Sequence, residues 1–158
     1  MPSLYNLTQT DQGYSFVTDH NIEYTIFFTM YYLDDTDGNE HTIYSFGFER
    51  SGSFKAKKYE FSHDVKIKTT IIHVVKEFFI KNEDNALLYF CWPDDDFARH
   101  RSIIFSKWCK ESDDIEHKRG TVPYGTTNLY GGILVKKENP LKSLLVNAFE
   151  KHINDQFG

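Results

Sequence analysis

The sequence predicts a single α+β domain, in which a three-stranded antiparallel meander is extended by one or two further strands and packed by three helices. Three observations lead to this expectation. Apolar and polar residues alternate over residues 13–50, with the period of strands that bury one face. The period changes to that of a helix over residues 64–81. A chain of 158 residues, of which 40% are hydrophobic, suits one core rather than two.

The N-terminal third contains the meander. Residues 1–12 are polar and are expected to form a flexible leader. Three strands are predicted after it, over residues 14–18, 22–32 and 42–48. Residues 34–39, with sequence DDTDGN, separate the last two strands and have the composition of a hairpin turn, in which Gly38 can adopt a positive φ. The same acidic residues lack the full loop of a calcium site, so a solvated turn is the better interpretation.

The middle of the chain predicts a helix, a buried strand and a second helix. An apolar stripe runs along residues 64–81 and consists of Ile67, Ile71, Val74, Val75 and Phe78. Residues 86–92, with sequence ALLYFCW, form an unbroken apolar run that is typical of a strand buried on both faces. A second helix is expected over residues 96–110, with Arg101 on the side that faces the core.

The C-terminal part predicts a long loop, a short strand and a third helix. Residues 111–131 show no period and are rich in glycine and polar side chains, so they are expected to form a loop that is functional or mobile. A strand follows over residues 133–135. Asn139 is a favourable helix cap and Pro140 a favourable first helical residue, so the third helix starts here. The order is therefore βββ-α-β-α-loop-β-α.

Composition excludes some classes of function. The formal net charge of -5 argues against a partner that is nucleic acid, because such binding normally needs a basic face. The two cysteines are too few for a disulfide framework, and the start of the chain does not resemble a secretory signal. No apolar stretch approaches the roughly 20 residues that cross a bilayer. We therefore expect a cytoplasmic protein with no membrane contact.

The strongest candidate for a ligand site follows the buried strand. Asp95, Arg99, His100 and Arg101 could form a polar cluster that binds a phosphate-containing ligand, because a strand delivers them to the start of a helix. The alternative is structural: an aspartate caps the helix, and Arg101 makes an internal salt bridge. The sequence leaves both interpretations open.

The predicted loop holds a second candidate. Its basic and aromatic residues could contact a partner protein or a nucleic-acid strand; they are His117, Lys118, Arg119, Tyr124 and Tyr130. A solvated charge run explains the same residues without a partner. No catalytic residues are identified, and no metal or cofactor is expected, because the spacing of metal ligands, P-loops and dinucleotide sites is absent.

Several short motifs resemble those of a family of small bacterial proteins known only as a domain of unknown function. The motifs are Phe16, Thr18 and Asp19, then Tyr24, Ile26 and Phe28; Cys91, Asp95, Arg101, Phe105 and Trp108; and Lys137, Asn139 and Pro140. The resemblance extends from about residue 13 to residue 152. Trp92 and Phe97 depart from it, where acidic or polar residues are usual. The resemblance implies an accessory protein linked to bacterial defence or mobile-element loci, and no defined activity.

Two hypotheses for the function remain. The first is a protein-binding or accessory module, which binds another protein or a second copy of itself through exposed aromatic residues or through the predicted loop. The alternative is an enzyme or nucleotide-binding protein that uses the Asp/Arg cluster on a phosphate-containing ligand.

Overall fold

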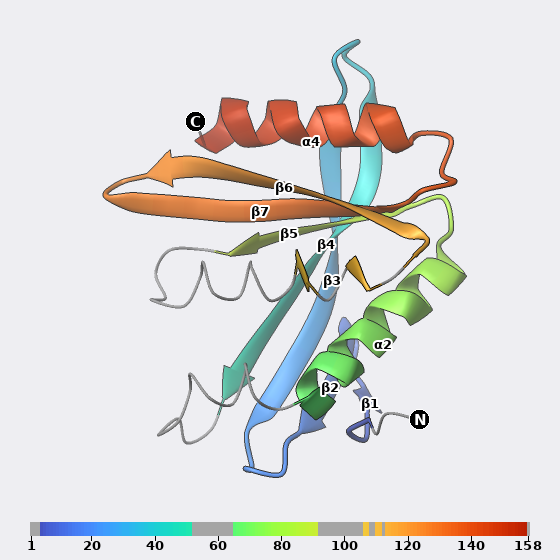
Figure 1. Cartoon of the computed structure of the whole chain (residues 1–158), viewed down its shortest axis with the longest axis vertical. Helices are drawn as coiled ribbons and strands as arrows, with labels where there is room; N and C mark the ends of the chain where they lie inside the picture. The colour runs from blue at the N-terminus through green and yellow to red at the C-terminus, as the bar shows by residue number, and fades with distance from the viewer. Residues whose placement is uncertain (1–3, 52–64, 92–105, 108–109, 112, 158) are drawn as a thin grey trace.

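The computed structural model describes residues 4–51, 65–91, 106–107, 110–111 and 113–157 of the chain. Within these residues, seven strands form one mixed sheet and two helices pack against it (Figure 1). The strands are β1 (Thr8–Gln9), β2 (Gly13–Val17), β3 (Glu23–Asp34), β4 (Glu40–Ser51), β5 (Ala86–Cys91), β6 (Ile115–Tyr124) and β7 (Thr127–Lys136). The helices are α2 (Val65–Lys81) and α4 (Lys142–Phe157). The predicted α+β class is confirmed, but the prediction that one or two further strands extend the meander is wrong, because β1, β5, β6 and β7 extend it.

The sheet has the strand order β1-β2-β3-β4-β5-β7-β6. Strands β2, β3 and β4 are the predicted meander, and the β3–β4 pair runs in unbroken register from Glu23 opposite Ser51 to Asp34 opposite Glu40. Only the β4–β5 pair is parallel among the described pairs. A parallel pair needs a long crossover connection, and α2 lies within that connection.

The two helices cover opposite faces of the sheet. On one face, Tyr24, Ile26 and Phe46 are buried with the apolar stripe of α2. On the other face, Leu33 and Ile43 are buried with the apolar side of α4. Alternation along β3 explains this division, because even-numbered residues point to the α2 face and odd-numbered residues to the α4 face. In Figure 1, α4 crosses the upper part of β3, and α2 lies nearer to β1 and β2.

Helix α2 and strand β5 confirm the predictions for residues 64–81 and 86–92. The predicted stripe of α2 is buried, and Ala86 to Leu88 of β5 are fully buried as expected for a strand covered on both faces. Before the C-terminal helix, the Leu141 amide donates a hydrogen bond of 2.8 Å to Oδ1 of Asn139, which supports the predicted capping role of Asn139. The helix begins at Lys142, two residues after the predicted first residue, Pro140.

Two helices are described as complete elements, rather than the three predicted. The third was expected over residues 96–110, most of which lie outside the described residues; residues 106, 107 and 110, which are described, are helical. No helix in the described ranges is both long and apolar enough to cross a membrane.

The prediction of a loop over residues 111–131 is also wrong. Strands β6 and β7 form a hairpin here, and the expected strand at 133–135 is the end of β7. Gly125 turns the chain with a φ of 62°, at the first central position of a two-residue hairpin loop. Proline has no backbone N–H to donate. Because β6 is at the edge of the sheet, the backbone nitrogen of Pro123 can face away from β7, and no hydrogen bond between the strands is lost.

The predicted flexible leader is ordered from residue 4 onward. Strand β1 pairs with β2, and Tyr5 is buried among the residues of the α2-side core. The Tyr5 amide donates a hydrogen bond of 3.0 Å to Oγ1 of Thr70 on α2. This segment is mostly polar, but it contains one buried aromatic residue, Tyr5. The contacts of Tyr5 are enough to fix the N-terminal residues against α2.

Candidate functional site

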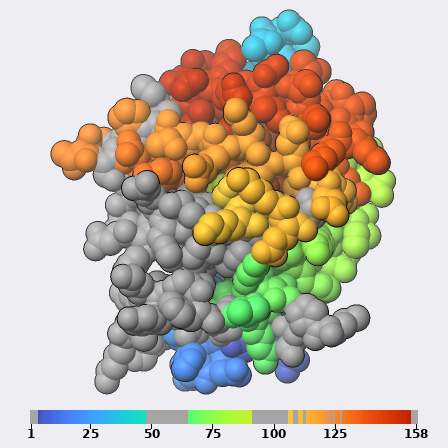
Figure 2. All heavy atoms as spheres, viewed as in Figure 1, coloured from blue at the N-terminus to red at the C-terminus, as the bar shows by residue number. Residues whose placement is uncertain are grey.

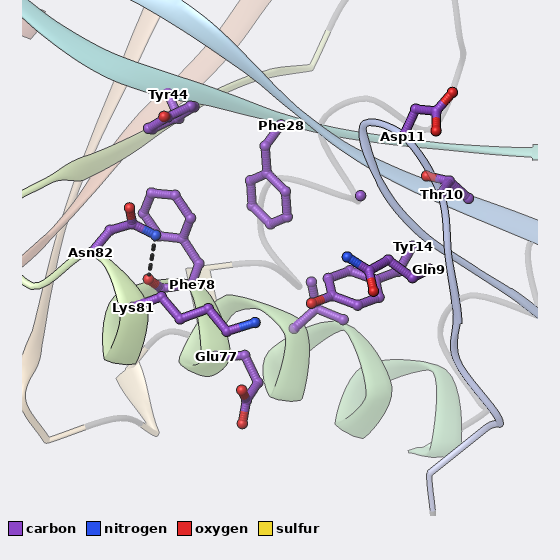
Figure 3. Close-up of a pocket in the computed structure, with 12 residues that line it drawn as sticks. Gln9, Thr10, Asp11, Tyr14, Phe28, Tyr44, Glu77, Phe78, Lys81 and Asn82 are labelled. Carbon is purple, nitrogen blue, oxygen red and sulfur yellow. Dashed lines mark hydrogen bonds between the residues drawn. The ribbon is translucent and has the colours of Figure 1, made fainter.

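A cleft of about 260 Å³ opens between the β1–β2 turn, the α2-side face of β3 and β4, and the C-terminal half of α2 (Figure 3). Its lining residues come from four separate stretches of the chain. They are Gln9, Thr10, Asp11, Gly13, Tyr14, Phe28, Tyr44, Val74, Glu77, Phe78, Lys81 and Asn82. The cleft therefore exists only when the N-terminal segment, the meander and α2 are assembled.

Aromatic rings form most of the apolar wall of the cleft. The rings of Phe28 and Phe78 are stacked with their centroids 5.2 Å apart, and Tyr44 meets Phe78 edge-on at 5.5 Å. Phe28 and Tyr44 occupy even-numbered positions of β3 and β4, which point to the α2 face. Such ring pairs are worth about 0.5–1.5 kcal/mol beyond their buried area. The wall is therefore preformed.

Polar side chains surround these rings. Asp11 comes from the β1–β2 turn, and Glu77 and Lys81 come from successive turns of α2 (Figure 3). Nδ2 of Asn82 donates a hydrogen bond of 2.9 Å to the carbonyl oxygen of Phe78. This bond satisfies one of the last carbonyl groups of α2, and so it ends the helix beside the cleft.

The described lining of the cleft combines aromatic rings with carboxylate, ammonium and amide side chains. Serine, cysteine and histidine are absent from the described residues that line it, and these residue types supply most nucleophiles and neutral-pH bases. In the described part of the chain, no group of three or more His, Cys, Asp or Glu residues could hold a metal ion. The cleft offers apolar contact area with a few polar groups at its rim.

A second cleft, of about 600 Å³, lies along the N-terminal segment and β2. Tyr5, Phe16 and Lys66 are among its lining residues. The ammonium group of Lys66 lies 4.5 Å from the centroid of the Tyr5 ring, and Tyr5 stacks on Phe16. These contacts hold the N-terminal segment on the fold, so we assign this region a structural role.

The predicted ligand cluster cannot be placed in the structure. Asp95, Arg99, His100 and Arg101 all lie outside the described residues. The phosphate-site hypothesis and its structural alternative therefore both stay predictions.

The predicted partner-binding residues lie on the β6–β7 hairpin but not on one surface. Figure 2 shows this hairpin beside α4. Lys118 faces α4, where its Nζ lies 3.5 Å from Oε1 of Glu150. His117 points to the opposite face, and its Nε2 lies 2.6 Å from the hydroxyl group of Tyr89. Burial lowers the pKa of His117 to about 4, helped by the charges of Arg119 and Lys110. His117 is therefore a neutral, packed residue rather than part of a solvated basic run.

Two of the other three candidates lie on the same face of the sheet as His117 but differ in exposure. Arg119 is exposed, and its position in the register puts it on the same face as His117. Tyr130 is half-buried against the α2-side core. Tyr124 ends β6, and its side chain lies outside the described part. Among the four candidates whose side chains are described, Lys118 therefore lies on the opposite face of the sheet from His117, Arg119 and Tyr130.

Sequence reasoning missed the cleft itself. It identified the strands and helix that carry Phe28, Tyr44 and Phe78, and it offered exposed aromatic residues as a binding surface. It placed Phe78 in the core-facing stripe of the helix and did not bring the three rings together. It also treated the segment that contains Gln9, Thr10 and Asp11 as a flexible leader. One signal was available. The two predicted strands carry more aromatic residues at even-numbered positions than a single helix can cover.

Comparison with known proteins identifies one relationship. The model of a family described as a family of unknown function (DUF6169) matches residues 63–151, from the start of α2 into α4. The C-terminal and middle motifs of the resemblance lie inside this range, and the motifs on β2 and β3 lie outside it. No curated protein and no solved structure matches the chain.

Proposed function

We propose that this chain, which belongs to the DUF6169 family of unknown function, is a protein-binding module that holds an apolar side chain of its partner in the cleft beside α2. The observation that carries this proposal is the preformed aromatic wall made by Phe28, Tyr44 and Phe78. Open apolar clefts on otherwise polar surfaces are typical of interaction sites. Family membership adds no activity of its own.

The size of the cleft favours a side chain over a metabolite. Pockets that bind small molecules usually measure about 300–1,000 Å³ and bury most of the ligand. The cleft beside α2, at about 260 Å³, falls just below that range. A single leucine, phenylalanine or methionine side chain gains roughly 1.5–3 kcal/mol on full burial. That is the contribution expected of one anchor residue at the centre of a protein interface.

Charge supports a protein partner over a nucleic acid. The formal net charge of -5 and the carboxylates of Asp11 and Glu77 at the rim would repel a phosphate backbone. A cytoplasmic location is part of the proposal, since the chain has only two cysteines and no disulfide framework. The defence or mobile-element context stays an implication of the resemblance. The alternative of a phosphate-binding enzyme rests on Asp95, Arg99, His100 and Arg101 alone.

The test is selection from a random phage-displayed peptide library on the purified protein. Glu77→Trp places a large side chain at the cleft, whereas Lys76→Trp places the same side chain on the neighbouring exposed position of α2, which does not line the cleft. We expect the wild type and Lys76→Trp to enrich the same peptides with an apolar anchor, and Glu77→Trp to lose them. Circular dichroism checks that both variants fold.

Two results would overturn the proposal. One is a lack of enrichment on the wild type over a blank support. The other is equal retention of the selected peptides by the two tryptophan variants, which would place the binding surface elsewhere.

A further inference from the structure

An exposed apolar strip continues the cleft along β3. Met30 and Tyr32 are 53% and 54% exposed, on the same face of β3 as Phe28. Met30 pairs with Tyr44, which lines the cleft, so the strip and the cleft share a boundary. Residues two apart on a strand are separated by roughly 7 Å, so the strip adds about 13 Å beyond Phe28. Single exposed apolar residues are ordinary, but two in line with an aromatic cleft form a continuous surface.

Carboxylates lie at both ends of this surface. Asp34 and Glu40 are exposed and directly paired at the end of the β3–β4 hairpin, next beyond Tyr32. Asp11 and Glu77 line the cleft at the other end, with Lys81 as the one cation among the described lining residues. Four carboxylates and one ammonium group therefore flank the apolar surface. An acidic rim attracts cationic segments and rejects anionic ones.

We propose that the partner segment is basic: it anchors an apolar side chain in the cleft, lies over Met30 and Tyr32, and presents lysine or arginine to Asp34 and Glu40. This inference rests on the proposed function and specifies the chemistry of the partner. The contact with the strip adds apolar area, and the charges orient the segment along β3.

Methionine labelling gives a direct readout of the strip. The chain has two methionines, Met1 and Met30, so methyl-¹³C-methionine labelling yields two signals, and Met30→Leu identifies the one on the strip. The probes are a short peptide of alternating leucine and lysine, and its counterpart with glutamate in place of lysine. We expect the lysine peptide to shift the Met30 signal and the glutamate peptide to leave it unchanged.

Charge variants test the orientation. Asp34→Asn combined with Glu40→Gln should weaken binding of the lysine peptide about fivefold at low salt, since each exposed charge contributes modestly. The matched control is Asp113→Asn combined with Glu138→Gln, which removes two exposed carboxylates from another part of the surface and should leave binding unchanged. Added salt should abolish the difference between the two variants.

The outcomes separate this inference from the proposed function. Equal shifts of Met30 by both peptides would overturn the basic partner. Loss of lysine-peptide binding in Glu77→Trp without any Met30 shift in the wild type would support the cleft and overturn the strip. A Met30 shift that persists unchanged in Glu77→Trp would support the strip and count against the cleft.

Discussion

The hydroxyl group of Tyr89 lies 2.6 Å from Nε2 of His117, and the Tyr89 ring reaches it across Gly132. Tyr89 is on β5, Gly132 is its partner on β7, and His117 is on the edge strand β6. A Cβ atom on Gly132 would lie 2.5 Å from the nearest ring carbon of Tyr89. The Tyr89 ring of β5 therefore contacts both β7 and β6, and only glycine at position 132 leaves room for it.

Gly132→Ala should destabilise the protein by roughly 1–3 kcal/mol, because the buried Tyr89 ring must move and loses its contact with His117. Urea denaturation measures the change in the free energy of unfolding. In a Tyr89→Val background the ring is gone, so the same glycine substitution should be almost neutral. If Gly132→Ala destabilised the protein equally in both backgrounds, the Tyr89 ring would not be the reason that position 132 is glycine.

The stability of the protein should fall as the pH is lowered from about 6.5 to about 4. Burial lowers the pKa of His117 from 6.5 to about 4 in the folded state. Between these values the unfolded chain binds more protons than the folded chain, so acid favours unfolding. The effect of this one group is at most about 3 kcal/mol.

His117→Gln removes this titration, so the variant should lose that part of the pH dependence in urea denaturation between about pH 4 and pH 7. Burial also lowers the pKa of His152, but His152 is present in both proteins and cancels in the comparison. Parallel stability curves for wild type and variant would contradict the assignment.

The parts of the fold that the sequence predicts are those in which a local pattern and the tertiary structure agree. The meander, α2, β5 and the Asn139 cap are of this kind, since period and cap chemistry act over a few residues. The β6–β7 hairpin was missed because its glycines and Pro123 are typical of loops. Gly132 makes room for the ring of a neighbouring strand, and Pro123 lies at a sheet edge. Neither reason is visible without the strand order.

The candidate site was less predictable, because it is assembled from distant segments. Phe28 and Phe78 are fifty residues apart in the sequence, and their stacking depends on how α2 crosses the sheet. The spacing of apolar residues along the sequence identifies which side of each helix or strand is apolar. It does not show where a helix stops covering a strand. That boundary decides which aromatic residues line a cleft and which are core.

Asp35 should be the residue on which the β3–β4 turn depends. Its Oδ1 accepts hydrogen bonds of 2.9 Å from the amides of Asp37 and Asn39, and its Oδ2 lies 2.8 Å from Nε2 of His41. The hydrogen bond with His41 and then that from Asn39 lower the pKa of Asp35. Asp35→Asn should reduce the Tm at neutral pH by roughly a few degrees. Asp37→Asn, on the same turn but exposed, is the control and should have little effect.

The pH dependence of this pair of variants gives a second check. Because the folded-state pKa of Asp35 is lowered, its contribution is present above the unfolded-state pKa of 3.8 and is lost as the pH falls through the folded-state value. The Tm difference between the wild type and Asp35→Asn should therefore shrink below about pH 3.8. A difference that is constant down to strong acid would mean that the charge of Asp35 is not what stabilises the turn.

Tyr5→Ala should destabilise the protein by about 3 kcal/mol, although the sequence predicts a flexible leader at this position. The Tyr5 ring is 6% exposed and stacks on Phe16 at 5.5 Å, and its amide is bonded to Thr70. Loss of the ring therefore leaves a cavity between β2 and α2. Asn6→Ala, at the exposed neighbouring position, should change the free energy of unfolding by less than about 0.5 kcal/mol. If both substitutions had equally small effects in urea denaturation, the N-terminal segment would be a flexible leader, as the sequence predicts. It would then not form a wall of the cleft.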